Sequence, residues 1–222
     1  RGAKAAPQTR WAPALVILVL ALLARVFVAD AIELAEDEAY YWVWSRELAW
    51  GYFDHPPAIA GIIRAGTALL GDTEVGVRLP GLLLGGITAG LAVTLAKERA
   101  LAAAALSTLP LFALGGVLAT PDLPLAAAWA LGLWAASRDR WALAGVACGL
   151  AMLSKYTGVL LLPALIIGTG AWRRPRAWGA ALLAGLIYAP NAVWNVQHDA
   201  ISWRFQLEHV AAAADRLGFI GA

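Results

Sequence analysis

The sequence predicts an all-α protein built as a polytopic bundle of membrane-spanning helices. Hydrophobic residues make up 61% of the 222 residues and charged residues 14%, whereas soluble domains carry about 25% charged residues. The mean hydropathy is +0.68. Alanine, leucine and glycine, which let helices pack closely in lipid, dominate the apolar runs. These observations favour a membrane bundle over a soluble fold.

Composition also limits the possible functions. A net charge of +2 is too small for nucleic-acid binding, and the basic residues fall in short clusters. Cys148 is the single cysteine, which excludes an intrachain disulfide and a cysteine-based metal site. The three histidines, His55, His198 and His209, follow no ligand spacing. We therefore expect no cofactor, and the spacing gives a divalent metal no support.

A spanning helix needs about 20 mostly apolar residues, and about seven segments meet or approach that length. They are Trp11–Ala29, Gly76–Ala96, Ala100–Ala119, Leu123–Ser137, Trp141–Ser154, Gly158–Trp172 and Ala177–Trp194.

Residues 1–222 read as one multi-pass domain, the N-terminal portion of a longer protein whose C-terminal part lies beyond them. Residues 1–10 precede the first span at 11–29, a long loop covers 30–75, and spans two to seven cover 76–194. Residues 195–222 are expected to form a loop and the start of a further span.

The connections alternate in charge, which predicts the orientation. The short connections at 97–99, 138–140 and 173–176 are basic, as is the segment before the first span. The positive-inside rule places this set in the cytoplasm. The N-terminus is then cytoplasmic and the long loop at 30–75 lies on the outer side.

That long loop is expected to lie along the membrane surface. Glu36–Trp50 is dense in tryptophan and tyrosine, which suits a helix in the headgroup layer. Pro56 and Pro57 end this stretch, and Ala58–Leu70 predicts a second short, interfacial helix.

The same loop holds the candidates for acid–base chemistry. Five of its acids fall within nine residues, namely Asp30, Glu33, Glu36, Asp37 and Glu38. A rigidly held carboxylate can act as a general base, whereas the ordinary reading of any one acid is a solvated loop. Asp37 and Glu38 are the stronger candidates because the aromatic run that follows would dock their helix.

Polar residues at the outer ends of the spans have two readings each. Asp54 and His55 either bind a polar group or cap the next helix, and Asp122 either caps the fourth span or contacts substrate. Lys155 lies between two short spans and faces either a lipid phosphate or the interface. Arg78 can be read in the same way.

Two further features complete the set. Arg25, inside the first span, is expected to pair with a loop acid. Residues 191–198, which include Asn195 and His198, mix tryptophan with amides, as sugar-binding surfaces and ordinary interfacial belts both do.

Five strings together indicate a family. They occur in the order EDEAYYW at 36–42, FDHPP at 53–57, RLP at 78–80, TPD at 120–122 and SKYTG at 154–158. The set resembles the bacterial branch of the dolichyl-phosphate-mannose–protein mannosyltransferase superfamily, which includes lipid A aminoarabinose transferases and lipopolysaccharide galacturonosyltransferases. The resemblance runs from the first span to about His209.

The resemblance implies a GT-C membrane fold of about a dozen helices in the bacterial inner membrane. Such enzymes take a sugar from a polyprenyl phosphate on the periplasmic side, invert its anomeric configuration and need no nucleic acid. Asp37 matches the acid that deprotonates the acceptor hydroxyl, with Glu38 beside it, and Arg78 and Lys155 match basic positions that face the donor phosphate. The substrate-binding candidates are Tyr41, Asp54, His55, Asp122, Tyr156, Asn195 and His198.

The sequence does not decide whether the acceptor hydroxyl belongs to a lipid, a glycan or a protein. Two other classes of function also stay open. A lipid or sugar transporter or flippase would place polar or broken segments near the bilayer midplane, whereas the unusual residues here gather at the outer face. In a non-catalytic scaffold the aromatic loop would serve only as an anchor among membrane lipids.

Overall fold

The computed structural model describes residues 11–220, and every regular element within them is a helix. The expected cytoplasmic stretch at 1–10 and the last two residues lie outside this range. The elements are α1 Trp11–Ala31, α2 Glu36–Arg46, α3 Ala58–Leu70, α4 Glu74–Leu95, α5 Arg99–Thr108, α6 Pro110–Gly115, α7 Asp122–Ser137, α8 Trp141–Ser154, η1 Tyr156–Leu160, α9 Leu161–Gly168, η2 Ala171–Arg173, α10 Pro175–Gln197 and α11 Ile201–Ile220.

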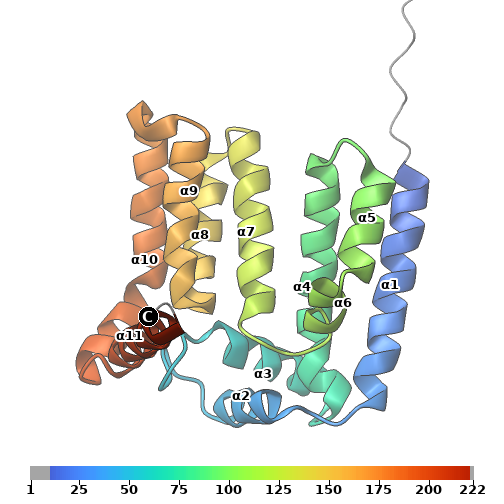
Figure 1. Ribbon diagram of the computed structural model, residues 1–222, viewed down its shortest axis with the longest axis horizontal. Helices are drawn as coiled ribbons and strands as arrows, with labels where there is room; N and C mark the ends of the chain where they lie inside the picture. The colour runs from blue at the N-terminus through green and yellow to red at the C-terminus, as the bar shows by residue number, and fades with distance from the viewer. Residues whose placement is uncertain (1–10, 221–222) are drawn as a thin grey trace, which may run out of the picture.

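Most of the helices run side by side, among them α1, α4, α7, α8 and α10 (Figure 1). On one side α4 packs against α1, α3 and α7, and on the other α8 packs between α7 and α10. Helices α2, α3 and α11 lie together at one end, which we call the α2 end (Figure 1). The fold therefore confirms an all-α membrane bundle with short helices in the loop at 30–75.

Helices α1, α4 and α10, of 21, 22 and 23 residues, are long and apolar enough to cross a membrane. The other expected spans are shorter helices that run alongside them (Figure 1). The third is interrupted, because α5 ends at Thr108 and α6 starts at Pro110. Leu109 is extended, with φ −61° and ψ 130°, as expected for a residue that precedes proline.

Arg25 stabilises this interruption. Its Nη2 donates to the carbonyls of Leu106 and Phe112, each at 3.0 Å. Leu106 lies four residues before Pro110, which has no N–H, so Arg25 supplies the donor that its carbonyl lacks. The Phe112 carbonyl also accepts the N–H of Gly116 at 3.1 Å. The expected ion pair between Arg25 and a loop acid is therefore wrong.

The sixth expected span begins as the 3-10 helix η1 and continues as α9. Gly158 permits this turn, because a Cβ there would lie 2.2 Å from the carbonyl carbon and oxygen of Ala151. Only glycine allows the chain to return so closely along α8.

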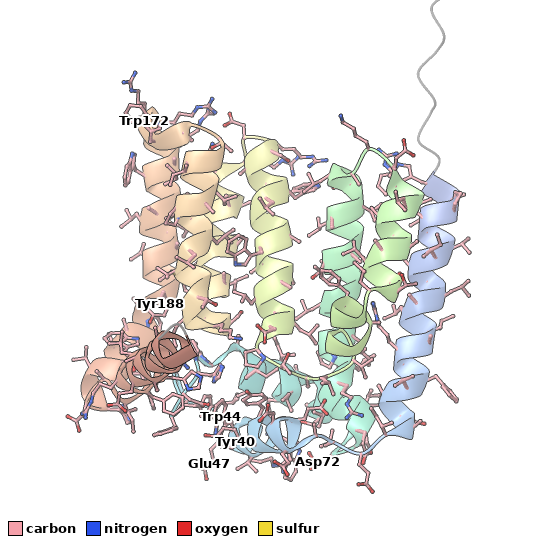
Figure 2. All side chains as sticks on the ribbon, viewed as in Figure 1. Tyr40, Trp44, Glu47, Asp72, Trp172 and Tyr188 are labelled. Carbon is pink, nitrogen blue, oxygen red and sulfur yellow. The ribbon has the colours of Figure 1, made fainter. Side chains whose placement is uncertain are left out.

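The basic connections lie at the end opposite α2, where Trp172 is found, while Tyr40, Trp44 and Glu47 lie at the α2 end (Figure 2). The segment after residue 195 differs from the expectation of a loop and a new span. Helix α10 continues to Gln197, and the 20-residue α11 lies at the α2 end (Figure 1). This helix carries Arg204 and Glu208 and is not among the helices apolar enough to span.

Candidate active site

Helix α2 is held on the bundle by its aromatic side chains. Tyr41 and Trp44 are buried, and the Trp44 ring stacks on Tyr52 with centroids 4.4 Å apart and planes at 4°. The helix ends at Arg46, four residues before the expected end at Trp50. The Tyr52 hydroxyl lies 3.1 Å from the carbonyl oxygens of both Trp44 and Glu47, so its single proton can be donated to either of them.

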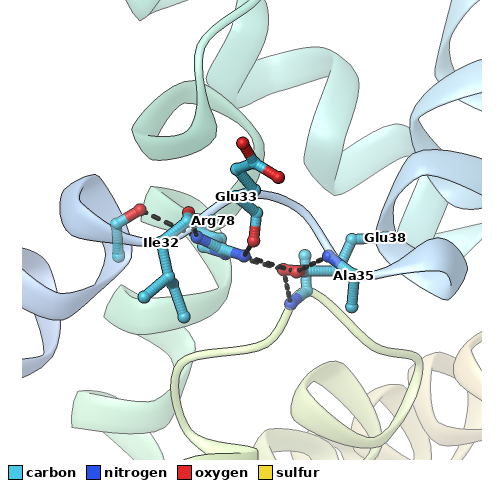
Figure 3. A network of polar contacts seen from close by, with 7 residues as sticks. Ile32, Glu33, Ala35, Glu38 and Arg78 are labelled. Carbon is cyan, nitrogen blue, oxygen red and sulfur yellow. Dashed lines mark hydrogen bonds and ion pairs between the residues drawn. The ribbon is translucent and has the colours of Figure 1, made fainter.

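A buried ion pair joins α2 to α4 (Figure 3). Arg78 donates to Glu38 twice, from Nε to Oε1 at 2.8 Å and from Nη2 to Oε2 at 2.6 Å. Its other N–H groups donate to the carbonyls of Ala29 and Ile32, both at 2.8 Å, and of Glu33 at 2.9 Å. These bonds use all five donors of the guanidinium.

Glu38 extends this network to a third segment. Besides Arg78, its carboxylate accepts the N–H of Ala35 at 3.0 Å and the N–H of Ala119 at 2.8 Å. Burial by itself raises the pKa of Glu38, but the bonds from Arg78, Ala119 and Ala35 outweigh burial and leave the pKa below its ordinary value. We call Glu38, Arg78 and the backbone groups they bind the Glu38–Arg78 clamp.

The clamp revises two expectations from the sequence. Arg78 has no donor left for a lipid phosphate, and Glu38 is fully buried with both oxygens bonded. This geometry does not support phosphate binding by Arg78 or a catalytic role for Glu38, so we assign a structural role to both side chains. The sequence could not show this because it does not reveal which of the neighbouring acids faces inward.

Asp37 lies on the exposed face of the same helical turn, where a substrate can reach it. One turn later stands the buried Tyr41, whose pKa is raised by burial and further by the carboxylates of Asp37, Asp54 and Asp122. These carboxylates come from α2, from the loop before α3 and from the start of α7. The charges of these three predicted site acids thus act on one phenol from three different segments.

Asp54 and His55 form a partly buried pair within this group. Asp54 Oδ2 lies 3.2 Å from His55 Nδ1, and the two side chains are 18% and 14% exposed. Asp54 Oδ1 is buried and accepts no hydrogen bond within the described part of the chain. An unmet buried acceptor costs about 1–3 kcal/mol, so this oxygen is suited to receive a hydroxyl group from a ligand.

Lys155 and Asp122 meet at the same end. Lys155 Nζ donates to Asp122 Oδ1 at 2.8 Å, and the side chains are 34% and 62% exposed. Asp122 lies in the first turn of α7, makes no capping bond there and turns its carboxylate to Lys155. The expected capping role of Asp122 is therefore wrong.

The remaining candidates divide into two places. Tyr156 and the buried Asn195 lie together, with Asn195 Nδ2 3.2 Å from the Tyr156 hydroxyl oxygen. His198 is exposed and stacks on Trp194, with ring centroids 4.1 Å apart, at the side of a separate pocket. Within the described residues, no three His, Cys, Asp or Glu side chains gather as a metal site would require.

Asp72 carries no signal in the sequence, yet the structure gives it a role. Its carboxylate accepts from Arg46 Nη1 at 2.8 and 3.0 Å and from Trp42 Nε1 at 3.0 Å. These bonds tie the last turns of α2 to the turn between α3 and α4. An aspartate in a turn has too many ordinary uses for its partners to be predicted.

An apolar groove of about 970 Å³ leads toward the α2 end of the bundle. It runs along α4 and α7 from Leu91 and Leu131 to Trp50, Pro57 and Ser154 at the α2 end. Ser154 adjoins Lys155, and Pro57 follows the Asp54–His55 pair after one intervening residue. The groove thus has apolar walls along its length and charged side chains beyond its end.

Residues 54–194 match the family model described as dolichyl-phosphate-mannose-protein mannosyltransferase. The lipid A galacturonosyltransferase RgtD of Rhizobium johnstonii is 34% identical over 189 residues, which cover 77% of this chain and 40% of the relative. An undecaprenyl phosphate-alpha-4-amino-4-deoxy-L-arabinose arabinosyl transferase of Pseudomonas aeruginosa is 31% identical over 198 residues, covering 76% and 35%. The chain therefore spans two fifths or less of the length of these curated relatives. No solved structure matches it.

Proposed function

The chain belongs to the dolichyl-phosphate-mannose-protein mannosyltransferase family, and on this basis we propose that it forms part of a membrane glycosyltransferase. The proposed enzyme takes a sugar from a polyprenyl-phosphate donor and transfers it to an acceptor hydroxyl. The names of its relatives refer to lipid A and to undecaprenyl phosphate. We extend these substrates to this chain as a class, with a lipid, glycan or protein as acceptor.

The apolar groove that ends at charged residues carries this proposal. A polyprenyl phosphate has a long apolar tail and a compact anionic head, and burying the tail supplies about 25 cal/mol per Å² of apolar surface. The groove walls suit the tail. Lys155 lies just past the groove end and can place a positive charge against the phosphate once it leaves Asp122.

The proposed reaction uses Asp37 as its general base. Asp37 takes the proton of the acceptor hydroxyl while its oxygen attacks the anomeric carbon. The bond from that carbon to the phosphate oxygen breaks, and the polyprenyl phosphate leaves with the bonding electrons. Lys155 balances the charge that develops on this leaving group. A single displacement inverts the anomeric centre.

The sugar of the donor is proposed to bind among five of the predicted site residues, which are Tyr41, Asp54, His55, Asp122 and Tyr156. The unmet Asp54 oxygen is an acceptor for one of its hydroxyls.

We further propose that the α2 end faces the periplasm, with the protein in the bacterial inner membrane and its N-terminus in the cytoplasm. Two basic connections, at 138–140 and 173–174, lie at the opposite end of the bundle (Figure 1). Such residues collect on the cytoplasmic side.

A lipid or sugar transporter is the second candidate, and the interrupted α5–α6 segment is the feature that favours it. Transporters use broken helices whose free backbone groups bind the substrate. Here Arg25 already binds the carbonyls of Leu106 and Phe112 at the break. The break is thus closed to a substrate by the protein's own side chain.

The deciding experiment uses the full-length protein in liposomes that contain lipid A and undecaprenyl phosphate carrying a labelled sugar. We expect the wild type to produce glycosylated lipid A, detected by mass spectrometry, and the Asp37→Asn variant to insert normally and produce none. Movement of labelled donor between leaflets without any product would instead support the transporter.

A further inference from the structure

The end of the bundle opposite α2 carries a strongly basic surface on two neighbouring segments. One lies between α7 and α8, and the other covers η2 and the first turn of α10 (Figure 1). Together they hold one acid, Asp139, and five exposed arginines, which we call the arginine surface. These are Arg138, Arg140, Arg173, Arg174 and Arg176. Five positive charges against one negative charge leave a net charge of +4.

Asp139 joins the two segments. Its Oδ1 lies 3.3 Å from Arg174 Nη1, and its Oδ2 pairs with Arg176. Asp139 Oδ1 also accepts the indole N–H of Trp141 at 2.8 Å. One negative charge is thus shared between two arginines, and because all three charged side chains are about half exposed, solvent weakens both pairs.

The other three arginines form no ion pair with an acid in the described part of the chain; they lie over aromatic rings. Arg138 Cζ and Arg140 Cζ are 4.4 and 5.2 Å from the centroid of the Trp134 ring. Arg173 Cζ is 4.0 Å from the centroid of the Trp172 ring. An aromatic face orients a cation without neutralising it, so these three charges are available to an external anion.

The backbone adds to this positive charge. Helices α8 and α10 both begin at this end of the bundle and run in the same direction (Figure 1). They are closely packed, since a Cβ added to Gly145 would lie 2.6 Å from the carbonyl oxygen of Ala180. Their first turns contain no acid, and Arg140 and Arg174 precede them without a capping bond. Helix starts carry a partial positive charge and ordinarily attract acids, so arginines placed here favour an anion.

We propose that the arginine surface binds the headgroup of an anionic phospholipid from the surrounding bilayer. Clustered arginines beside membrane helices attract anionic lipids, and the guanidinium binds a phosphate through paired N–H groups. Trp172 and Trp178, which are 54% and 59% exposed, precede and follow the second segment. Exposed tryptophans lie at the level of the headgroups, which makes a membrane lipid the occupant. This proposal depends on membrane insertion and not on sugar transfer.

The test measures lipid binding to the full-length, detergent-solubilised protein by native mass spectrometry. The probe is phosphatidylglycerol, and zwitterionic phosphatidylcholine is the comparison. We expect the wild type to prefer phosphatidylglycerol. Its affinity should fall about tenfold or more when the three arginines without an acidic partner are replaced together, because each contributes separately to the attraction. That variant is Arg138→Gln/Arg140→Gln/Arg173→Gln. The matched control removes three exposed arginines of α2, α3 and α11 and should keep the wild-type affinity; it is Arg46→Gln/Arg64→Gln/Arg204→Gln.

Asp139→Asn separates lipid binding from damage to the fold. Asparagine keeps a carbonyl oxygen for the Trp141 indole but removes the charge that competes for Arg174 and Arg176. The affinity for phosphatidylglycerol should therefore rise, whereas a damaged fold would lower it. Equal affinity of the wild type and the first triple variant, a loss shared by the control, or no rise in Asp139→Asn would overturn the proposal. Displacement of the lipid by an equimolar amount of inorganic phosphate would overturn a lipid as the occupant.

Discussion

Arg78 of α4 holds Glu38 of α2 through two hydrogen bonds of 2.8 and 2.6 Å, across 40 positions of sequence. The same carboxylate accepts the N–H of Ala119, three residues before Asp122. Asp37 is the neighbour of Glu38 on α2. The clamp therefore fixes the turn that carries Asp37 against the segment that carries Asp122. It makes the geometry of the candidate site depend on Arg78, which is fully buried and has no donor left for a ligand.

The first prediction concerns stability. We expect Arg78→Ala to lower the free energy of unfolding by about 3–5 kcal/mol, because it leaves the buried Glu38 charge unpaired. Arg46→Ala is the matched control: its ion pair with Asp72 is 46% exposed on both sides, so about 0–1 kcal/mol is expected. Denaturant unfolding of the detergent-solubilised protein measures both. Equal losses would show that the clamp is not a buried pair.

The second prediction concerns how the stability contributed by Glu38 depends on pH. The pKa of folded Glu38 lies below the ordinary value of 4.5, so the unfolded state takes up the proton first as pH falls. The stabilisation is complete above pH 4.5 and is lost as pH falls through the folded pKa. Glu38→Gln should thus be less stable than wild type at neutral pH, with a smaller difference in acid. Melting temperatures across this range test it, and a constant difference would contradict it.

The third prediction separates Asp37 from Glu38. Asp37→Asn should reduce kcat by about 10²–10⁴-fold, as removal of a general base does, with an unchanged melting temperature because the side chain is exposed. Glu38→Gln should lower both kcat and the melting temperature. Glu36→Gln, exposed in the same turn, is the control and should retain activity. A stable, fully active Asp37→Asn enzyme would remove Asp37 as the base.

The fourth prediction concerns Lys155. We expect Lys155→Ala to raise the donor KM about tenfold or more and leave the acceptor KM within about twofold, because its proposed partner is the donor phosphate. Lys97→Ala, in a connection at the opposite end of the bundle, should change neither constant. Steady-state kinetics with each substrate varied in turn would decide, and an unchanged donor KM would show that Lys155 serves only its pair with Asp122.

The fifth prediction concerns the apolar groove. Gly61 lines it, and an added Cβ there would meet no atom within 4 Å. Gly61→Leu therefore starts from an open Cβ position and occupies groove space, and removing a helical glycine stabilises α3 by about 0.5–1 kcal/mol. We expect a raised donor KM in a protein at least as stable as wild type. Gly90→Leu is the control, since Gly90 has the same open space but does not line the groove; equal effects from both would argue against the groove as donor site.

Features that depend on neighbouring residues could be predicted from the sequence alone. Hydropathy located the helices, and the two prolines before Ala58 set the start of α3, which ends at Leu70 as expected. The alternation of basic connections matched the two ends of the bundle. The strings of acids, aromatics and prolines led to the family that the comparison then showed. Such features are local because helix formation and membrane partition act over about 20 residues at a time.

The partners of the charged side chains became known only from the folded arrangement. Five acids fall in nine residues of the loop, yet Glu38 faces inward and Asp37 outward, a choice made by the position of Arg78 on α4. Arg25 binds backbone carbonyls instead of an acid because the helix is interrupted beside it, between α5 and α6. Side-chain pairing depends on how distant helices pack, and buried charges take whichever partners that packing brings within hydrogen-bonding distance.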